Sequence, residues 1–401
     1  MLDTKVPASS LPTDGLSLEQ LTAPVGEERF LSEYWEARAL HCQAGEGRGA
    51  RFVPLLSSNT IDAMIAGQRF REGELSLARS DPRISPDDYL LDNGEIDRGA
   101  VMRFWQQGAT IILPQLERRH IELAHFCRQL EAVFSAHVQT NIYLTPAGAQ
   151  GFHTHYDNHC VFVCQVEGRK RWRLYDTPAG TPFRGERFTP GKFAAGEPVA
   201  EFVLEPGDML YVPRGLMHDA VSEPGSHSLH ITTGVIVKTL ADFVLEAVAE
   251  ASLRAPALRR SMPAGFHRDD FDRESLRTLF ETALDTARRE ADLDSVLDLF
   301  TDAFVRTRQP DLSGGLTGGP VTSDTRIARH PQTAMRLASD GHHIALVMAG
   351  GDISFDEGAA PALEAFLAGA TLSQADFAAL GDDKARDAVE RLLAFGAAKR
   401  V

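Results

Sequence analysis

The stretch that most constrains the fold is Gly151-Phe-His-Thr-His-Tyr-Asp-Asn-His-Cys160. Potential metal ligands recur in it at every second position, at His153, His155, Asp157 and His159. Alternate side chains of a strand share one face, so an extended run would place all four on the same side. A second stretch, residues 207–218, reaches His218 through the spacing Gly-x5-Pro-x-Gly-x2-His. We therefore expect a metal site between two β segments, with His218 supplied from a distance.

Short runs rich in β-branched and aromatic residues surround these two stretches and are separated by Gly and Pro turns. The runs are residues 108–114, 138–145, 161–166, 169–175, 201–204, 209–212 and 228–237. Many short strands with such turns predict a jelly-roll barrel or a sandwich. Glu167-Gly168 between the third and fourth runs predicts a hairpin there. Helical periodicity predicts helices over 26–41 and 116–134.

The length of 401 residues exceeds what one hydrophobic core usually supports. At Lys238 the periodicity becomes helical and stays so to residue 308, and a Gly- and Pro-rich linker follows at 309–320. Beyond it, two strands (342–350 and 352–355) and two helices (361–368 and 385–395) are expected. We predict an α+β chain with a barrel and N-terminal helices in 1–237, a helical block in 238–308 and a winged-helix-like domain in 321–401.

Several functional classes are disfavoured by composition. No apolar run approaches the roughly 20 residues of a membrane helix, and the N-terminus lacks the pattern of a secretory signal. The four cysteines form no Cys-x-x-Cys pair, which favours a reducing cytoplasm. A net charge of −15 argues against nonspecific nucleic-acid binding. The arginines at 169, 171 and 173 are interpreted as a solvated strand face rather than a nucleic-acid patch.

Two sets of metal ligands compete. In the first, His153, His155 and His218 bind the metal, as in many cupins, whose second motif the 207–218 stretch resembles. Those cupins also carry a glutamate four or five residues after the second histidine, where this chain has His159 and Cys160. In the second set, two imidazoles and one carboxylate occupy one face of an octahedron and leave three positions open, as Fe(II) oxygenases require. That set is His155, Asp157 and His218, and the missing glutamate favours it.

Lys170 gives an independent indication. In the run Arg169–Leu174 it shares the inward face with Trp172 and Leu174. A buried lysine is costly unless an anion meets it, and a 2-oxoglutarate carboxylate is a suitable anion. Tyr143, on the strand before the His/Asp run, is a second candidate contact for that carboxylate. The alternative is a distorted strand with Lys170 at the solvent edge.

The residues that carry these features resemble the JmjC-type ribosomal oxygenases, which are Fe(II)- and 2-oxoglutarate-dependent protein hydroxylases with a double-stranded β-helix. The matching segments are residues 141–146, His155-Tyr-Asp157, 162–175 and 206–218, and the helical block resembles that family's dimerisation region. The resemblance implies that iron binds His155, Asp157 and His218, and that Lys170 and Tyr143 contact 2-oxoglutarate. It also implies dioxygen as the second cosubstrate, a homodimer, and a protein or peptide substrate, with a ribosomal protein as the candidate.

One departure from that family concerns cosubstrate binding. Gly234 stands where some members have a serine that contacts the cosubstrate, so Thr232, Thr233 or a water is expected to take over. Two alternatives remain open from the residues themselves. The first is a Zn- or Mn-dependent cupin isomerase or hydrolase, which leaves Lys170 unexplained. The second is a noncatalytic dimeric binding module, for which the ligand triad has no use.

Overall fold

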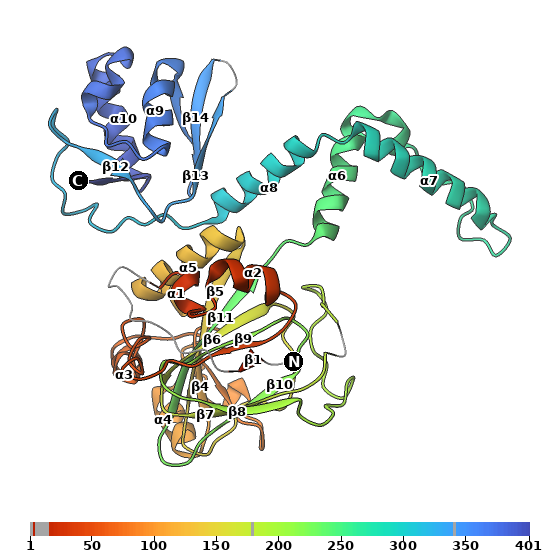
Figure 1. Cartoon of the computed structure of the whole chain (residues 1–401), viewed down its shortest axis with the longest axis vertical. Helices are drawn as coiled ribbons and strands as arrows, with labels where there is room; N and C mark the ends of the chain where they lie inside the picture. Colours follow the sequence, from red (N-terminus) through yellow and green to blue (C-terminus); the bar gives the residue numbers. More distant parts are fainter. Residues whose placement is uncertain (1–2, 5–15, 178–179, 340–341) are drawn as a thin grey trace. The chain divides into compact units, whose positions relative to one another are not determined.

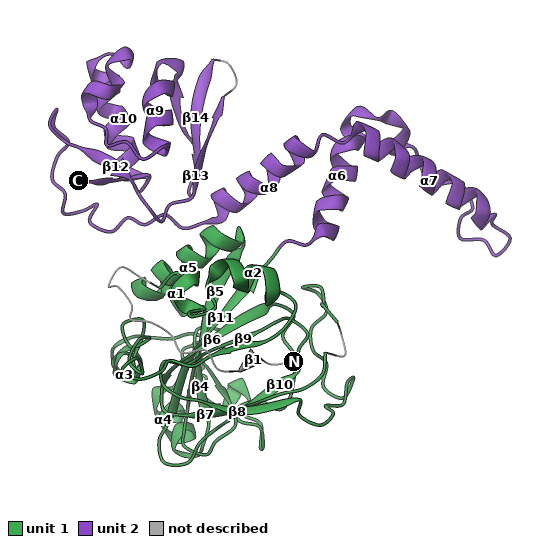
Figure 2. Ribbon diagram, viewed as in Figure 1, with its two compact units in different colours: residues 1–237 green, residues 238–401 purple. Residues whose placement is uncertain are grey.

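The computed structural model describes residues 3–4, 16–177, 180–339 and 342–401. The chain divides into two compact units, residues 1–237 and residues 238–401 (Figures 1 and 2). No helix within the described ranges has the length and apolar character needed to cross a membrane.

The first unit is built on two facing sheets. The larger sheet has the order β1 (Asp3–Thr4), β2 (Leu40–Cys42), β9 (Met209–Val212), β6 (Cys160–Glu167), β11 (Ser228–Ile236), β5 (His137–Thr145), β4 (Thr110–Pro114) and β3 (Ser76–Ala78). The smaller has the order β10 (His218–Ser222), β7 (Lys170–Leu174) and β8 (Ala200–Leu204). All pairings are antiparallel except that of β1 with β2. This arrangement confirms the predicted jelly-roll, or double-stranded β-helix.

Strand β6 shows how the sequence fills both sides of the larger sheet. Its residues Cys160, Phe162 and Cys164 join the core under the helices, whereas Val161 and Val163 pack toward the smaller sheet. Both faces of the strand are buried, so its sequence is a nearly continuous apolar run and does not alternate between apolar and polar residues.

Short helices complete the first unit. They are α1 (Leu18–Leu21), α2 (Glu27–Glu33), α3 (Ser58–Gly67), α4 (Arg98–Gln106) and α5 (Ile121–Phe134), with 3₁₀ turns η1 (Pro86–Asp88) and η2 (Leu116–Arg118). Helix α5 buries Leu123, Phe126 and Leu130 in the same core as β5, β6 and β11. The opposite face of the larger sheet is thereby left to the smaller sheet.

The hairpin predicted around Glu167-Gly168 is wrong. β6 pairs with β9 and β11, whereas β7 pairs with β8 and β10, so the chain crosses from one sheet to the other at this turn. Gly168 has φ +64°, and a Cβ there would lie 1.9 Å from the carbonyl oxygen of His227. The turn residue was recognised correctly, but close packing against another loop, rather than strand pairing, decides its direction.

Both N-terminal helix predictions ran too long. The segment 116–134 splits into η2 and α5 because Glu117 accepts hydrogen bonds from the amide and hydroxyl of Thr140 on β5 (2.8 and 3.0 Å). The segment 26–41 stays helical only to Glu33. The amide of Glu36 donates to the Tyr211 hydroxyl at 2.9 Å, and the chain then joins the larger sheet as β2. In both cases, contacts with distant strands override helical periodicity.

The second unit begins with α6 (Leu240–Arg254), η3 (Pro256–Arg259), α7 (Arg273–Glu290) and α8 (Leu293–Thr307). It continues with the pair β12 (Ile327–Arg329) and β16 (Ala398–Arg400) and the antiparallel sheet β13 (Met335–Ser339), β14 (His343–Met348) and β15 (Ile353–Asp356). The turns η4 (Glu357–Ala359) and η5 (Gln374–Leu380) and the helices α9 (Ala360–Leu367) and α10 (Asp382–Ala394) pack with these strands around one core. β12, β13 and β16 were not predicted, since three to five residues give little periodicity.

Candidate active site

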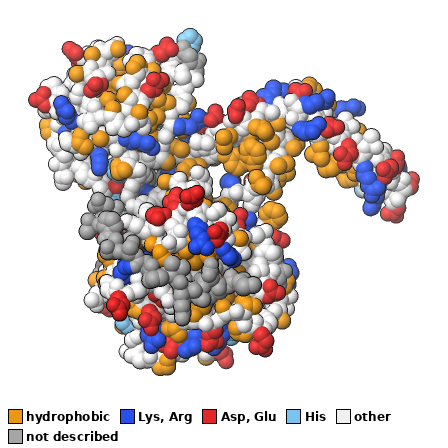
Figure 3. All heavy atoms as spheres, in the orientation of Figure 1, with side chains coloured by type: hydrophobic (Ala, Val, Ile, Leu, Met, Phe, Trp, Pro, Cys, Tyr) orange, Lys and Arg blue, Asp and Glu red, His pale blue; other side chains and the backbone are white. Residues whose placement is uncertain are grey.

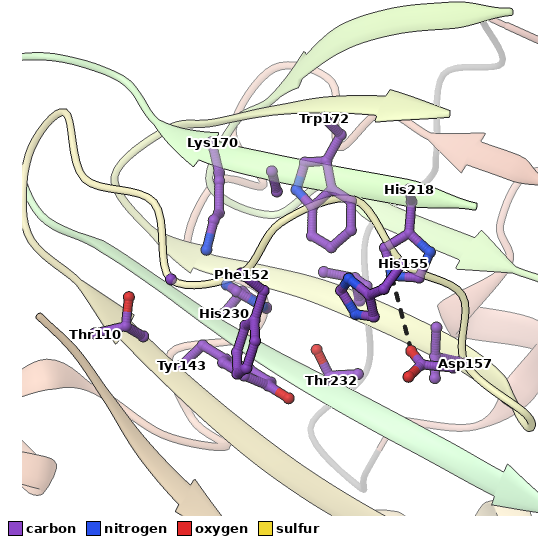
Figure 4. Close-up of a pocket in the computed structure, with 14 residues that line it drawn as sticks. Thr110, Tyr143, Phe152, His155, Asp157, Lys170, Trp172, His218, His230 and Thr232 are labelled. Carbon is purple, nitrogen blue, oxygen red and sulfur yellow. Dashed lines mark ion pairs between the residues drawn. The ribbon is translucent and has the colours of Figure 1, made fainter. Parts of the chain in front are cut away.

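The structure brings His155, Asp157 and His218 together. One ligand atom from each residue lies within 4.8 Å of the other two. His218 begins β10, and His155 faces it through an isolated bridge in which each backbone amide donates to the other's carbonyl (3.0 and 2.7 Å). The carbonyl of Asp157 accepts from the amide of Gly215 at 2.9 Å. Two segments distant in sequence are thus joined by backbone hydrogen bonds at the point where the three side chains converge (Figure 4).

Hydrogen bonds orient both imidazoles. The Nδ1 atom of His155 lies 2.9 Å from the carbonyl oxygen of His153, and the Nδ1 atom of His218 lies 3.0 Å from that of Leu216. Because a carbonyl can only accept, each Nδ1 carries the proton and donates it. Each Nε2 is then left with a lone pair that can bind a metal, the usual arrangement of metal-binding histidines.

The electrostatics of the triad suit a divalent cation. Burial lowers the pKa of His218 to about 4, and the neighbouring His155 acts in the same direction, so His218 is neutral at physiological pH. Burial alone would raise the pKa of the Asp157 carboxyl. The nearby imidazoles of His155, His218 and His159 outweigh that effect and lower it, so Asp157 stays ionised. Two imidazoles and a carboxylate are a ligand set that fits Fe(II).

The other two histidines of the run lie outside the triad. The Nε2 atom of His153 is 3.0 Å from the carbonyl oxygen of Ser80, and the side chain is exposed. The ring of His159 lies over Gly234, where a Cβ would be 2.7 Å from its Cδ2 and Nε2 atoms. The expectation that all four residues share one strand face is therefore wrong. Residues 151–159 form no regular strand, and β6 begins only at Cys160.

A cavity extends from the triad between the two sheets and encloses about 580 Å³, part of it open to solvent. The larger sheet contributes Thr110, Tyr143, Val161, Val163, His230 and Thr232, and the smaller contributes Lys170, Trp172, His218 and Ala220. Gly151 and Phe152 come from the segment that carries His155 and Asp157. The jelly-roll thus places side chains from both sheets on a single space.

Lys170 reaches into this cavity from β7, as its alternation with Arg171 and Arg173 predicts (Figure 4). It is 5% exposed, and its Nζ atom donates to the Thr145 hydroxyl at 3.3 Å. Burial lowers the pKa of Lys170 to about 7. No carboxylate forms an ion pair with Lys170 among the residues that the structure describes. The solvent-edge alternative is thereby excluded, and the ammonium is left for an anion.

At this end of the cavity, sequence reasoning missed His230 and recognised Trp172 only as an inward-facing apolar residue. His230 on β11 is 3% exposed. In the described structure, neither its Nδ1 atom nor the Nε1 atom of Trp172 has a hydrogen-bond partner. The His230 ring stacks on Tyr143 (centroids 4.9 Å apart) and meets Trp172 edge-on (5.8 Å). Burial and Lys170 lower the pKa of His230 well below its usual value, so it is neutral. The alternation of His230 with Thr232 was the available signal.

Tyr143 and Thr232 both line the cavity, whereas Thr233 points to the other side of β11 and is fully buried. Burial, with Asp157 nearby, raises the pKa of the Tyr143 phenol above its usual value, so it remains a donor. Thr232 therefore stays a candidate cosubstrate contact, and Thr233 does not reach the cavity. Gly234 has no side chain to contact a cosubstrate, and the His159 ring occupies the space that a side chain there would need.

Comparison with known proteins identifies residues 115–243 as a JmjC domain. A protein of Drosophila erecta, a bifunctional lysine-specific demethylase and histidyl-hydroxylase NO66, is 34% identical over 260 residues, which cover 61% of this chain and 38% of that protein. The NO66 protein of Aedes aegypti is 29% identical over 348 residues, covering 78% and 52%. The chain thus spans about two fifths to one half of the length of these relatives.

Among solved structures, Escherichia coli YcfD is similar to this chain, with a TM-score of 0.53, 16% identity, and coverage of 94% of this chain and 99% of that one. A YcfD structure described as a ribosomal oxygenase in complex with cobalt and 2-oxoglutarate gives a TM-score of 0.50 at 17% identity, covering 93% and 97%. At this identity the likeness concerns the fold. Together with the JmjC domain, it confirms the resemblance expected from the sequence.

Proposed function

We propose that the chain is a JmjC-type ribosomal oxygenase, and thus an Fe(II)- and 2-oxoglutarate-dependent protein hydroxylase, because residues 115–243 match a JmjC domain and the similar proteins are of that type. The observation that carries the proposal is one cavity that joins a His-Asp-His triad to a buried lysine without an acidic partner in the described structure. A zinc or manganese cupin without an anionic cosubstrate would gain nothing from burying Lys170, whose desolvation is costly.

Each residue has a definite task in this proposal. His155 and His218 bind iron through Nε2, and Asp157 supplies the anionic ligand. Bound iron and 2-oxoglutarate would together supply the activation of dioxygen and the oxidation of a C–H bond.

At the other end of the cavity, Lys170 holds the far carboxylate of 2-oxoglutarate. Tyr143, Thr232, Trp172 and His230 are candidate contacts beside it. Val161 and Val163 form an apolar floor that keeps bulk water away from the cosubstrate.

The metal and cosubstrate are tested by anaerobic titration. Fe(II) followed by 2-oxoglutarate should produce a visible charge-transfer band, and under air the protein should convert 2-oxoglutarate to succinate. Asp157→Ala should abolish both, whereas His153→Ala should retain both because its ring contacts Ser80 instead. Consumption of 2-oxoglutarate by Asp157→Ala at the wild-type rate would rule out the triad.

We propose a protein side chain as the substrate, with a ribosomal protein as the first candidate. Relatives named histidyl-hydroxylases and a structural neighbour named a ribosomal oxygenase support this class. The net charge of −15 is compatible with a basic partner of that kind. Ribosomes incubated with the wild-type protein, iron and 2-oxoglutarate should yield one peptide with an added oxygen that is absent with Asp157→Ala.

We further propose that the helical block (residues 238–308) pairs two copies of the chain. Its apolar side chains are unusually exposed, including Leu240 (84%), Leu253 (74%) and Leu245 (70%). Figure 3 shows hydrophobic side chains gathered on this block. Large exposed apolar patches mark interaction sites. The third predicted segment, residues 321–401, remains a proposed winged-helix-like domain.

Two further proposals concern partners and location. Arg169, Arg171 and Arg173 each form an ion pair with a glutamate, which supports a solvated face rather than a nucleic-acid contact. All four cysteines are buried and unbridged, which supports a reducing compartment such as the cytoplasm.

A further inference from the structure

The segment that carries His155 and Asp157 has little regular structure of its own. Within the part of the chain that the structure describes, its one bridge to a strand is the backbone pair between His155 and His218. A metal site needs ligands that are held in place before the metal arrives, and groups behind the ligands usually provide that support. The structure contains such a group in a residue outside the cavity.

Asp219 follows His218 on β10. His218 and Ala220 line the cavity, so Asp219 points to the opposite face of the strand, where it is 5% exposed. One carboxylate oxygen, Oδ2, accepts hydrogen bonds from the Thr154 hydroxyl at 2.7 Å and from the Tyr175 hydroxyl at 2.6 Å. The other, Oδ1, lies 3.6 Å from Nη1 of Arg173. This buried carboxylate therefore collects contacts from three separate positions.

These contacts link two parts of the metal site. Thr154 immediately precedes His155 in the chain, and Tyr175 follows β7, whose residues Lys170 and Trp172 line the cavity. Burial, with Asp219 adding to the effect, raises the pKa of the Tyr175 phenol, so it remains protonated and donates. Hydrogen bonds to a charged group are stronger than neutral ones, and those at 2.6–2.7 Å are short.

We propose that Asp219 is a positioning residue that fastens the ligand-bearing segment to β10 through Thr154 and so sets the place of His155 before any metal binds. This inference rests on the proposed metal site but concerns the protein's own hydrogen bonds. Thr154 is the better residue to change, because it is half-buried and removing its hydroxyl leaves the Asp219 carboxylate paired with Tyr175.

The first test uses the metal-free full chain. Thr154→Val removes the hydroxyl at nearly constant size, and Thr154→Ser keeps it. The readout is hydrogen exchange of the His155 amide, which donates to the His218 carbonyl at 3.0 Å. We expect exchange at least about tenfold faster in Thr154→Val, because one lost hydrogen bond to a charged group corresponds to 1.5 kcal/mol or more. Thr154→Ser should match the wild type.

The second test measures Co(II) affinity and the visible Co(II) spectrum. Thr154→Val and Asp219→Asn should weaken Co(II) binding by about 10–100-fold, the usual effect of losing a group behind a ligand. Tyr175→Phe removes the other hydrogen bond to the same oxygen but keeps the ring that packs against Tyr156 of the ligand segment, and it should weaken binding less than Thr154→Val. Unchanged exchange and unchanged affinity in Thr154→Val would overturn the inference. If the wild type bound no Co(II), the proposed metal site would fail, while the exchange comparison would still decide the role of Asp219.

Discussion

His155 and His218 are paired through their backbones, each amide donating to the other's carbonyl at 3.0 and 2.7 Å, while their rings lie 4.7 Å apart between centroids. The pairing fixes two proposed metal ligands from distant parts of the chain relative to each other. Asp157 is brought to them through the bond between its carbonyl and the amide of Gly215. The consequences for metal and cosubstrate binding can be tested separately.

Loss of a triad side chain should abolish tight metal binding. His218→Ala removes one of two imidazoles, and we expect Co(II) affinity to fall by more than the ~10–100-fold typical of groups behind the ligands. His153→Ala is the matched control from the same run, and its affinity should stay within a few-fold of the wild type. Calorimetric titration of the metal-free protein measures both, and equal losses in the two variants would contradict the assignment.

The charge of Lys170 predicts how 2-oxoglutarate binding depends on pH. The pKa of about 7 in the ligand-free protein means that Lys170 is mostly neutral above that pH and must take up a proton to meet a carboxylate. Affinity should therefore fall about tenfold per pH unit above pH 7, as for uptake of one proton. Calorimetry in buffers of different ionisation enthalpy measures the proton count, and Lys170→Met should bind weakly with no such slope.

The same residue affects folding stability with a defined sign. The folded-state pKa of Lys170 lies below the unfolded value of 10.5, so the unfolded chain binds more protons between about pH 7 and 10.5. The free energy of unfolding contributed by this group rises with pH across that window and is lowest below it. Lys170→Met should remove this dependence and stabilise the ligand-free protein near pH 7, as measured by urea denaturation. If Lys170→Met were less stable than the wild type near pH 7, the inference that the buried charge of Lys170 destabilises the ligand-free protein would be wrong.

His230 should matter for cosubstrate and not for metal. Its Nδ1 atom is buried without a partner in the described structure, so His230→Phe removes an unsatisfied polar atom while keeping an aromatic ring on Tyr143. We expect stability to be unchanged or higher and 2-oxoglutarate affinity to fall by about tenfold, the equivalent of one hydrogen bond. Co(II) affinity serves as the internal control and should not change. If His230→Phe bound 2-oxoglutarate as tightly as the wild type does, a contact between His230 and the cosubstrate would be excluded.

Gly234 and His159 should behave as a matched pair. A Cβ at Gly234 would stand 2.7 Å from two ring atoms of His159, so Gly234→Ala should destabilise the protein by about 1–3 kcal/mol through overpacking. The double variant with His159→Ala should recover most of that loss, because it removes the ring that collides. Denaturation of the four proteins gives the coupling energy, and strictly additive losses would show that the ring does not set the requirement for glycine.

The helical block predicts a dimer that a single charge can weaken. Leu253→Asp and Leu297→Asp each replace an exposed apolar side chain of the block with a carboxylate. In the single chain Leu253 is 74% exposed and Leu297 is 58% exposed. We expect the mass in solution to shift from dimer toward monomer by light scattering. Leu316→Asp, in the linker and fully exposed, is the control and should leave the mass unchanged. If light scattering gave the mass of a monomer for the wild-type protein at micromolar concentration, the dimer proposal would be wrong.

The sequence by itself indicated the residues of the candidate site. The spacing of His155, Asp157 and His218 indicated the triad, and the alternation of Lys170 with arginines indicated an inward charge. The inward position of Lys170 follows from the two-residue period of a strand, because β7 is regular. His155 and Asp157 lie outside any regular strand, so their meeting with His218 depends on backbone pairing between distant segments. The missing glutamate at His159 and Cys160 selected between two ligand sets, and the structure turns His153 toward Ser80 accordingly.

Tertiary structure alone decided how these pieces meet. The turn at Gly168 was visible, but only packing against His227 shows that it joins two sheets instead of two paired strands. The places of His230, Trp172 and Asp219 likewise depend on which strands face each other. Local periodicity specifies which side chains share a face, whereas strand pairing and close packing between distant segments specify what that face meets. The sequence therefore indicated the candidate ligands and the candidate anion-binding lysine, and the fold decided what holds them in place.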